Sequence, residues 1–287
     1  MGALTVRAHT RAGVAANLLA EECTVWAGLD SPAMSFSGRF STDNFAGEIS
    51  DIEVFLNGKI WFRGRTDKQE IVLSARGRHV ALEARTRGAL LLDNEAEPRQ
   101  YHNVGWDTMF RRHGAPYSFL SGDYDKSKTL LNYQIPKGTS EWEALTGWVY
   151  RAYGWLPCVQ ENSILLRRPI PAAVPVFSNK GGGLPYTTLI RRFIPYHIIS
   201  QTILRDSAGG YSTPVRNKTA DDYAIQRKRY EIPQTEFTAF AVWDAEQRMA
   251  QAAARSRTVT LEAPLAVAEQ PQYMQTVQKP LAEDKKY

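Results

Sequence analysis

The dipeptide Asn57-Gly58 is the feature that most restricts how this chain can fold. It is the strongest short-range signal for a tight β-hairpin, because both residues tolerate the positive φ angles of a two-residue turn. Apolar side chains recur at every second position over residues 52–56, and residues 59–63 form the returning strand. The sequence therefore predicts an antiparallel strand pair here.

The register of this hairpin decides which side chains share a face. A two-residue turn predicts that Val54 lies opposite Trp61 and that Glu53 lies opposite Phe62. Neither face is then cleanly polar, so one face fills a barrel and the other meets another domain or another chain. A buried strand pair of a sandwich is the alternative interpretation. The candidate interface residues are Val54, Phe55, Ile60, Trp61 and Phe62.

Further β patterns surround the hairpin. Residues 35–41 alternate around two phenylalanines, and residues 71–75 and 80–84 alternate on either side of a glycine. A polar, proline-containing stretch follows at residues 94–100. These patterns predict a first β domain over residues 1–96.

Residues 97–171 have a mixed pattern and predict a small α/β module. Ser140 and Glu143 have the spacing of a capping box, and Gly154 stands where a helix C-cap is expected. Asn103 is a candidate cap for a shorter helix that precedes it. The longer helix carries an apolar stripe at helical spacing, which predicts a core face: Leu145, Trp148, Val149 and Ala152.

The last third of the chain predicts a second β domain with one Ala-rich helix, over residues 172–264. Asp244 and Gln247 repeat the capping spacing ahead of that helix, and residues 258–261 form a β-type run after it. Residues 265–287 predict an extended tail. The expected fold class is α+β, mainly β.

Composition excludes several classes of protein. Lys and Arg number 35 and Asp and Glu 30, and the resulting net charge of +5 is too small to predict nucleic-acid binding. No apolar run approaches the roughly 20 residues of a membrane-spanning helix, and the N-terminal residues lack a signal-peptide core. Cys23 and Cys158 alone make neither a disulfide framework nor a zinc site. We expect an intracellularly folded chain of more than one domain.

Motifs for catalysis and metal binding are absent from the sequence. Asp123 and Asp125 lack the glycine and glutamate of a calcium loop, and the glycines at 181–183 lack the lysine of a phosphate-binding loop. No histidine pair has metal-binding spacing, so each histidine is predicted to be a solitary surface or loop side chain: His9, His79, His102, His113 and His197.

Two groups of charged residues leave alternatives open. Asp107, Glu141 and Glu143 lie near aromatic residues and are candidates for a sugar-cleaving acid pair, but their separation cannot be read from sequence. The basic clusters are interpreted as surface or interface charge rather than a DNA contact: Arg167-Arg168, Arg191-Arg192 and Arg227-Lys228-Arg229. We expect no catalytic residue, no cofactor and no metal.

The order of several blocks resembles the baseplate hub protein of contractile phage tails and related prophage tail proteins, a late-control-protein-like tail hub family. Each block is weak alone, and their order over residues 30–264 gives the resemblance its specificity. The blocks are Phe62-Arg63-Gly64-Arg65-Thr66-Asp67, the run from Ala84 to Asp93, the helix Ser140–Gly154, the segment Ser163–Pro169 and the run from Asp244 to Leu261. The chain departs from the family in being short and in lacking a glycine-rich strand after Ala263-Pro264.

The resemblance implies two tube-like antiparallel β-barrel domains with the small module between them. It implies a homotrimer whose six similar domains form a pseudo-sixfold ring, joining the sixfold tail tube to the threefold central spike. Its partners would be further copies of itself, the tail tube protein, the central spike protein and other baseplate proteins, without membrane contact. DNA would only pass through the lumen, and the protein would reside in the virion after assembly in the bacterial host cytoplasm. The alternatives are a distal tail or tube-capping protein and a tail-associated cell-wall hydrolase.

Overall fold

The structure is a computed structural model that separates the chain into two compact units, Met1–Val176 and Phe177–Pro264. Each unit is described by itself. The described residues are 4–13, 15–28, 31–41, 47–75, 77–122, 127–166, 177–180, 183–233 and 241–263. The predicted tail at 265–287, Asp123, Asp125 and the pair Arg167-Arg168 lie outside them.

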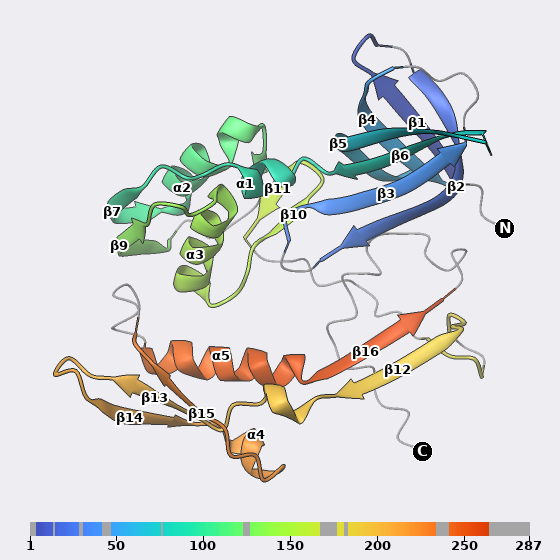
Figure 1. The fold of residues 1–287 in the computed structure, drawn as a ribbon. Coiled ribbons are helices and arrows are strands. Elements are labelled where there is room, and N and C mark those ends of the chain that lie inside the picture. Colours follow the sequence, from blue (N-terminus) through green and yellow to red (C-terminus); the bar gives the residue numbers. More distant parts are fainter. Residues whose placement is uncertain are drawn as a thin grey trace. The chain divides into compact units, whose positions relative to one another are not determined.

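A closed antiparallel barrel of six strands opens the first unit (Figure 1). The strands follow one another in the order β1-β2-β3-β6-β5-β4, and β4 pairs with β1 to close the barrel. Their bounds are β1 Leu4–Thr10, β2 Ala15–Ala27, β3 Met34–Ser41, β4 Ile49–Leu56, β5 Lys59–Ser74 and β6 Gly77–Arg85. The mainly β fold class and the predicted hairpins are confirmed.

The barrel encloses its own hydrophobic core. Alternating side chains of every strand point inward, as period-2 patterning requires. The buried residues are Val6, Ala8, Leu18, Phe36, Phe40, Ile49, Ile52, Val54, Phe62, Val80, Leu82 and Ala84. Strands β1 and β2 were not identified from the sequence, because β2 keeps most of its side chains exposed and lacks a clear apolar alternation.

The small α/β module completes the described part of the first unit. A two-stranded sheet lies beside α2 and α3, and a three-stranded sheet has the order β10-β11-β8 (Figure 1). The bounds are α1 Ala89–Asp93, β7 Arg99–Gly105, α2 Trp106–His113, the 3-10 helix η1 Ala115–Tyr117, β8 Leu120–Ser121, β9 Thr129–Ile135, α3 Glu141–Tyr153, β10 Cys158–Gln160 and β11 Ser163–Leu165.

The long helix of the module follows the sequence signals. Ser140 accepts a hydrogen bond from the Glu143 N–H, the Glu143 side chain accepts one from the Ser140 N–H, and Gly154 adopts a left-handed C-cap with φ 79°. The capping box and the C-cap are therefore confirmed. Trp148 is fully buried in the apolar stripe and its indole N–H donates to the Val104 carbonyl at 3.1 Å. Asn103 is not a cap, because α2 begins after Gly105 and Asn103 lies within β7.

The second unit contains two small sheets and a long helix. Its elements are β12 Thr188–Phe193, the 3-10 helix η2 Pro195–His197, β13 Gln201–Arg205, β14 Tyr211–Arg216, α4 Lys218–Asp221, β15 Lys228–Glu231, α5 Ala241–Arg255 and β16 Arg257–Glu262. Strand β12 pairs with β16, and the other sheet has the order β14-β13-β15. The second barrel that the family resemblance implies is not present as a closed barrel among the described residues.

Helix α5 packs on the three-stranded sheet through a small core. Ala245 and Met249 of the helix contact Leu204 and Val215 of the sheet. Asp244 is not the N-cap of α5, because the helix already includes Ala241; its carboxylate instead pairs with Arg248 at 2.8 Å. The predicted helix itself and its break into a strand after Arg255 are confirmed.

Candidate functional site

The predicted hairpin at Asn57-Gly58 is present, but its register differs from the prediction. Val54 lies opposite Phe62 rather than Trp61, because a bulge follows the Phe55–Ile60 pair and takes Trp61 out of the ladder. This shift places Val54 and Phe62 on the same face, where both are buried in the barrel core. These two side chains belong to the interior of the barrel rather than to an interface.

The other three candidate interface residues lie outside the core. The side chain of Ile60 is 50% exposed, Phe55 is half-buried beneath the guanidinium of Arg7, and Trp61 is half-buried against the barrel core. We retain Phe55, Ile60 and Trp61 as candidates for contact with another chain.

The barrel exposes further large apolar side chains that the sequence analysis did not assign to an interface. They lie on β2 and at the end of β5, where the β5–β6 hairpin turns. The residues are Leu19, Trp26, Ile71, Val72 and Leu73. Ile71, Val72 and Leu73 are consecutive, so they form one exposed apolar segment at the end of β5.

Two sequence blocks that carry the family resemblance meet at one ion-pair cluster between the barrel and the module. Arg85 at the end of β6 contacts Asp67 of β5 at 2.6 Å and Asp93 of α1 at 2.7 Å. The Arg85 guanidinium lowers the pKa of the Asp93 carboxyl below its ordinary value. The cluster thus ties the last barrel strand to the first helix of the module.

Two glycines in the same blocks allow this close junction. A Cβ atom on Gly88 would lie 1.9 Å from the Pro32 carbonyl oxygen, and one on Gly64 would lie 2.7 Å from the Arg85 carbonyl oxygen. Backbone atoms cannot move aside as a flexible side chain can. Any larger residue at Gly88 or Gly64 would therefore displace the junction.

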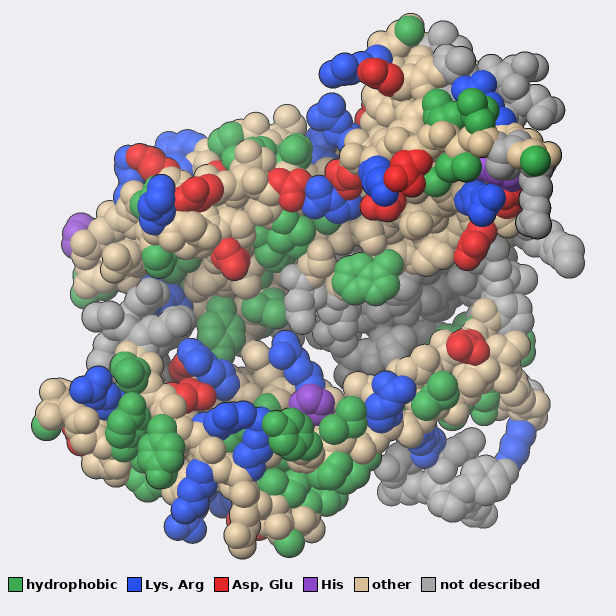
Figure 2. All heavy atoms as spheres, in the orientation of Figure 1, with side chains coloured by type: hydrophobic (Ala, Val, Ile, Leu, Met, Phe, Trp, Pro, Cys, Tyr) green, Lys and Arg blue, Asp and Glu red, His purple; other side chains and the backbone are tan. Residues whose placement is uncertain are grey.

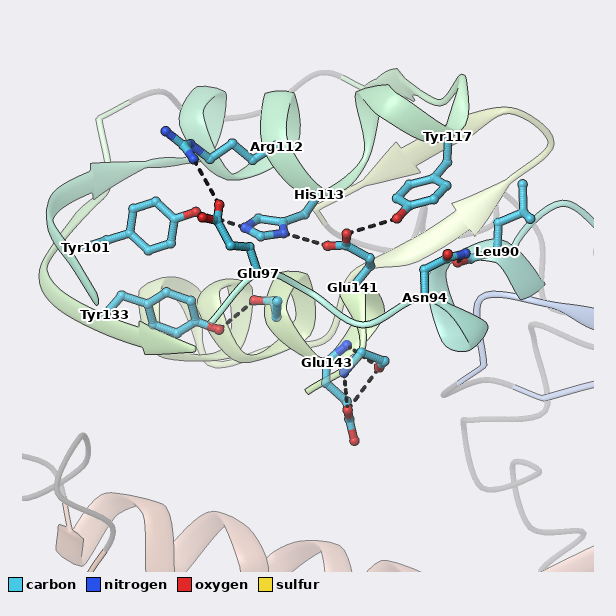
Figure 3. Close-up of polar contacts among 12 residues, drawn as sticks. Leu90, Asn94, Glu97, Tyr101, Arg112, His113, Tyr117, Tyr133, Glu141 and Glu143 are labelled. Atoms are coloured by element: carbon cyan, nitrogen blue, oxygen red, sulfur yellow. Dashed lines mark hydrogen bonds and ion pairs between the residues drawn. The ribbon is translucent and has the colours of Figure 1, made fainter. Parts of the chain in front are cut away.

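A buried polar network joins α2 to α3 within the module (Figure 3). Nδ1 of His113 donates to Oε2 of Glu141 at 2.6 Å, and its Nε2 lies 3.1 Å from the Tyr101 hydroxyl. The Tyr117 hydroxyl donates to the other oxygen of Glu141 at 3.0 Å. The prediction that His113 is solitary is therefore wrong, and its partner Glu141 is 28 residues away in the sequence.

The carboxylate of this network is buried and fully bonded. The side chains of His113 and Glu141 are only 3% and 9% exposed, and both oxygens of the carboxylate are held by protein donors. Burial and the bond to Glu141 raise the pKa of Tyr117 to about 12, and burial raises the pKa of Tyr101. Glu143 is engaged in the capping box, and Asp107 is exposed in the first turn of α2. The carboxylates that were candidates for catalysis thus lie in the first turns of helices and in this network.

The prediction of solitary histidines is also wrong for two histidines of the barrel. His9 lies 3.3 Å from Glu53 of the neighbouring strand β4, and His79 of β6 lies 3.0 Å from Glu21 of β2, which is two strands away. No cluster of metal-ligating side chains occurs among the described residues. Burial and the neighbouring Glu22 raise the pKa of Cys23, which disfavours the reactive thiolate. Within the same residues, no helix is long and apolar enough to cross a membrane.

Comparison with solved structures identifies the class of this fold. The chain is similar to the tail protein from Neisseria meningitidis, with a TM-score of 0.70 at 17% identity over 91% of this chain and 79% of that one. It is also similar to a 43 kDa prophage tail protein from Shewanella oneidensis, with a TM-score of 0.71 at 14% identity over 90% and 81% of the two chains.

A third similar structure is the prophage tail protein gp18 from Listeria monocytogenes, with a TM-score of 0.53 at 11% identity over 90% and 80% of the chains. No family model and no curated protein matches the sequence. The chain therefore has the fold of phage and prophage tail proteins.

Proposed function

We propose that this chain is a structural protein of a phage tail and serves as the baseplate hub of a contractile tail. The observation that carries the proposal is the likeness to tail proteins, which extends over about nine tenths of the chain in each case. A match of that extent covers the barrel, the module and the second unit alike, so it concerns the architecture and not one common domain.

In this proposal three copies form a ring. Each copy contributes two β domains, so that three chains provide six similar domains in one ring. The six domains match the sixfold tail tube on one side, and the three chains match the threefold spike on the other. The partners are the tube protein, the spike protein and other baseplate proteins, and the site of action is the virion after assembly in the host cytoplasm.

The exposed apolar residues of the barrel support the ring. Closed rings need heterologous contacts, in which one face of a subunit meets a different face of its neighbour. Ile60 is exposed at the start of β5, beside the half-buried Phe55 and Trp61, whereas Ile71 to Leu73 are exposed at the other end of β5. Two separate exposed apolar regions are what such a contact requires.

The experiment is a mass measurement on the purified chain by size-exclusion chromatography with light scattering. A trimer of 32.3 kDa subunits has a mass of about 97 kDa. That mass, maintained on dilution, supports the hub. A particle of 32.3 kDa at all micromolar concentrations contradicts it.

A distal tail or tube-capping protein is a second candidate, and one observation favours it. Only one closed barrel occurs among the described residues, and a sixfold ring of single barrels needs no second one. Six subunits of 32.3 kDa give about 194 kDa, so the same measurement separates the two candidates.

A further inference from the structure

The second unit contains a strongly basic pocket between α5 and β15 with a volume of about 310 Å³. Arg229 belongs to β15, Arg227 directly precedes the strand, and both arginines line the pocket. Arg248 and Arg255 are seven residues apart, which places them on one face of α5. His197 of η2 also lines the pocket. The sequence flagged the cluster at 227–229 but not the two arginines of the helix.

The positive charge of this pocket is only partly balanced. Asp244 at 2.8 Å and Glu231 at 3.7 Å both pair with Arg248. Arg229 and Arg255 have no acidic partner among the described residues. Figure 2 shows Lys and Arg side chains gathered on the visible face of this unit. The positive charge of Arg229 and Arg255 is therefore available to bind an anion.

One arginine is held in position by an aromatic ring. The guanidinium of Arg227 lies 4.4 Å from the ring centroid of Tyr196 and also bonds to the Tyr196 carbonyl. Stacking fixes the plane of the guanidinium, and a planar fork of donors matches a carboxylate in bidentate geometry. Because the guanidinium of Arg227 is already fixed, its side chain loses little conformational entropy when a carboxylate binds.

We propose that this pocket binds carboxylate side chains of an acidic, extended segment of a partner protein. A recess between a helix and a strand admits a single side chain, whereas nucleic-acid binding is typical of a basic patch or stripe that extends over one face of a domain. Strand β15 is moreover the edge of the sheet β14-β13-β15 within the described residues, so an extended segment has a backbone edge to pair with beside the pocket. The inference rests on the second unit alone and does not depend on the proposed ring.

The experiment measures binding of fluorescein-labelled hexaglutamate to the full chain by fluorescence anisotropy at low salt. The double variant Arg229→Ala/Arg255→Ala is compared with Arg191→Ala/Arg192→Ala, whose arginines are exposed on β12 of the same unit. We expect binding to weaken by about tenfold per pocket arginine removed, which is the typical value of one charge-assisted hydrogen bond, and to stay unchanged in the control pair. Hexaglutamine is expected not to bind.

Several results would overturn the proposal. Equal losses in the two double variants would indicate diffuse attraction without a site, and unchanged binding in the pocket variant would place the peptide elsewhere. A 20-base-pair duplex that binds more tightly than hexaglutamate, and loses its binding in the pocket variant alone, would assign the site to nucleic acid. Neither Arg229 nor Arg255 contacts the core, so unchanged circular dichroism spectra serve as the folding check.

Discussion

The barrel and module of the first unit differ sharply from the second unit in how much apolar surface they bury. The barrel core and the module core contain twelve and sixteen buried apolar residues, whereas the described part of the second unit has a cluster of four. The second unit instead exposes large aromatic side chains, among them Tyr196, Tyr211 and Tyr230. Exposed tyrosine and arginine side chains are typical of protein interfaces. Among the described residues, the first unit thus has the larger cores, and the second unit exposes more of its aromatic side chains.

The largest expected effect is on the module core. Trp148→Ala removes a fully buried indole and leaves the Val104 carbonyl without its donor, and we expect it to lower the free energy of unfolding by about 4 kcal/mol. Met109→Ala in the module core and Met249→Ala in the small cluster of the second unit are the matched pair, with expected costs of about 4 and about 2 kcal/mol. Urea denaturation followed by circular dichroism measures both. Equal costs would contradict the difference between the two units.

The second largest effect on stability is expected for the buried network of the module. Glu141→Gln removes the charge that His113 and Tyr117 bind, and we expect a cost of about 2 kcal/mol in the free energy of unfolding. Glu143→Gln, which preserves a capping box, is the control and should cost much less.

The same network predicts an alkaline pH dependence. The pKa of Tyr117 is about 12 in the folded chain, above its ordinary value of 10, so its contribution to stability is complete below pH 10 and is lost as the pH rises toward 12. Difference titration of the absorbance of ionised tyrosine, wild type against Tyr117→Phe, measures this pKa. A value near 10 for Tyr117 would show that its hydroxyl is not bonded to Glu141.

The junction between barrel and module is expected to contribute less. Arg85→Met keeps the aliphatic stem but removes both ion pairs, and because the cluster is partly exposed we expect about 1 kcal/mol. The pKa of Asp93 is lowered in the folded chain, so the contribution is present above pH 4 and is lost as the pH falls below it. Wild type and variant should thus differ at pH 7, and the difference should shrink as the pH falls through the folded pKa of Asp93. A difference that does not shrink on acidification would assign the effect to packing.

The smallest effect on stability is expected for the exposed apolar residues of the barrel. Ile60→Ser and Leu73→Ser should change the free energy of unfolding of a single chain by less than about 0.5 kcal/mol, because both side chains are exposed. Both should nevertheless lower the mass measured by light scattering at a given concentration. Lys59→Ser, next to Ile60 and equally exposed, is the control and should leave the mass unchanged.

Local signals explain which parts of the fold could be predicted from the sequence. The turn at Asn57-Gly58 and the capping box at Ser140 depend on residues next to one another, and both are present. The bulge at Trp61 is set by the need to return Phe62 to the barrel interior, which only the closed sheet imposes. Register is therefore a property of the tertiary structure.

The candidate site was less predictable because its partners are distant in the chain. His113 and Glu141 meet only when the end of α2 packs against the start of α3, and Arg85 meets Asp67 and Asp93 only at the junction. The basic pocket combines side chains of η2, of the segment that ends in β15, and of α5. No spacing rule within a single segment reveals such groups.

Electron microscopy of the purified protein tests the proposed role most directly. Class averages should display a closed, three-cornered annulus with six lobes surrounding a central opening wide enough for a duplex. Isolated single particles without an opening, or annuli of strict sixfold symmetry made from six chains, would contradict the trimeric hub.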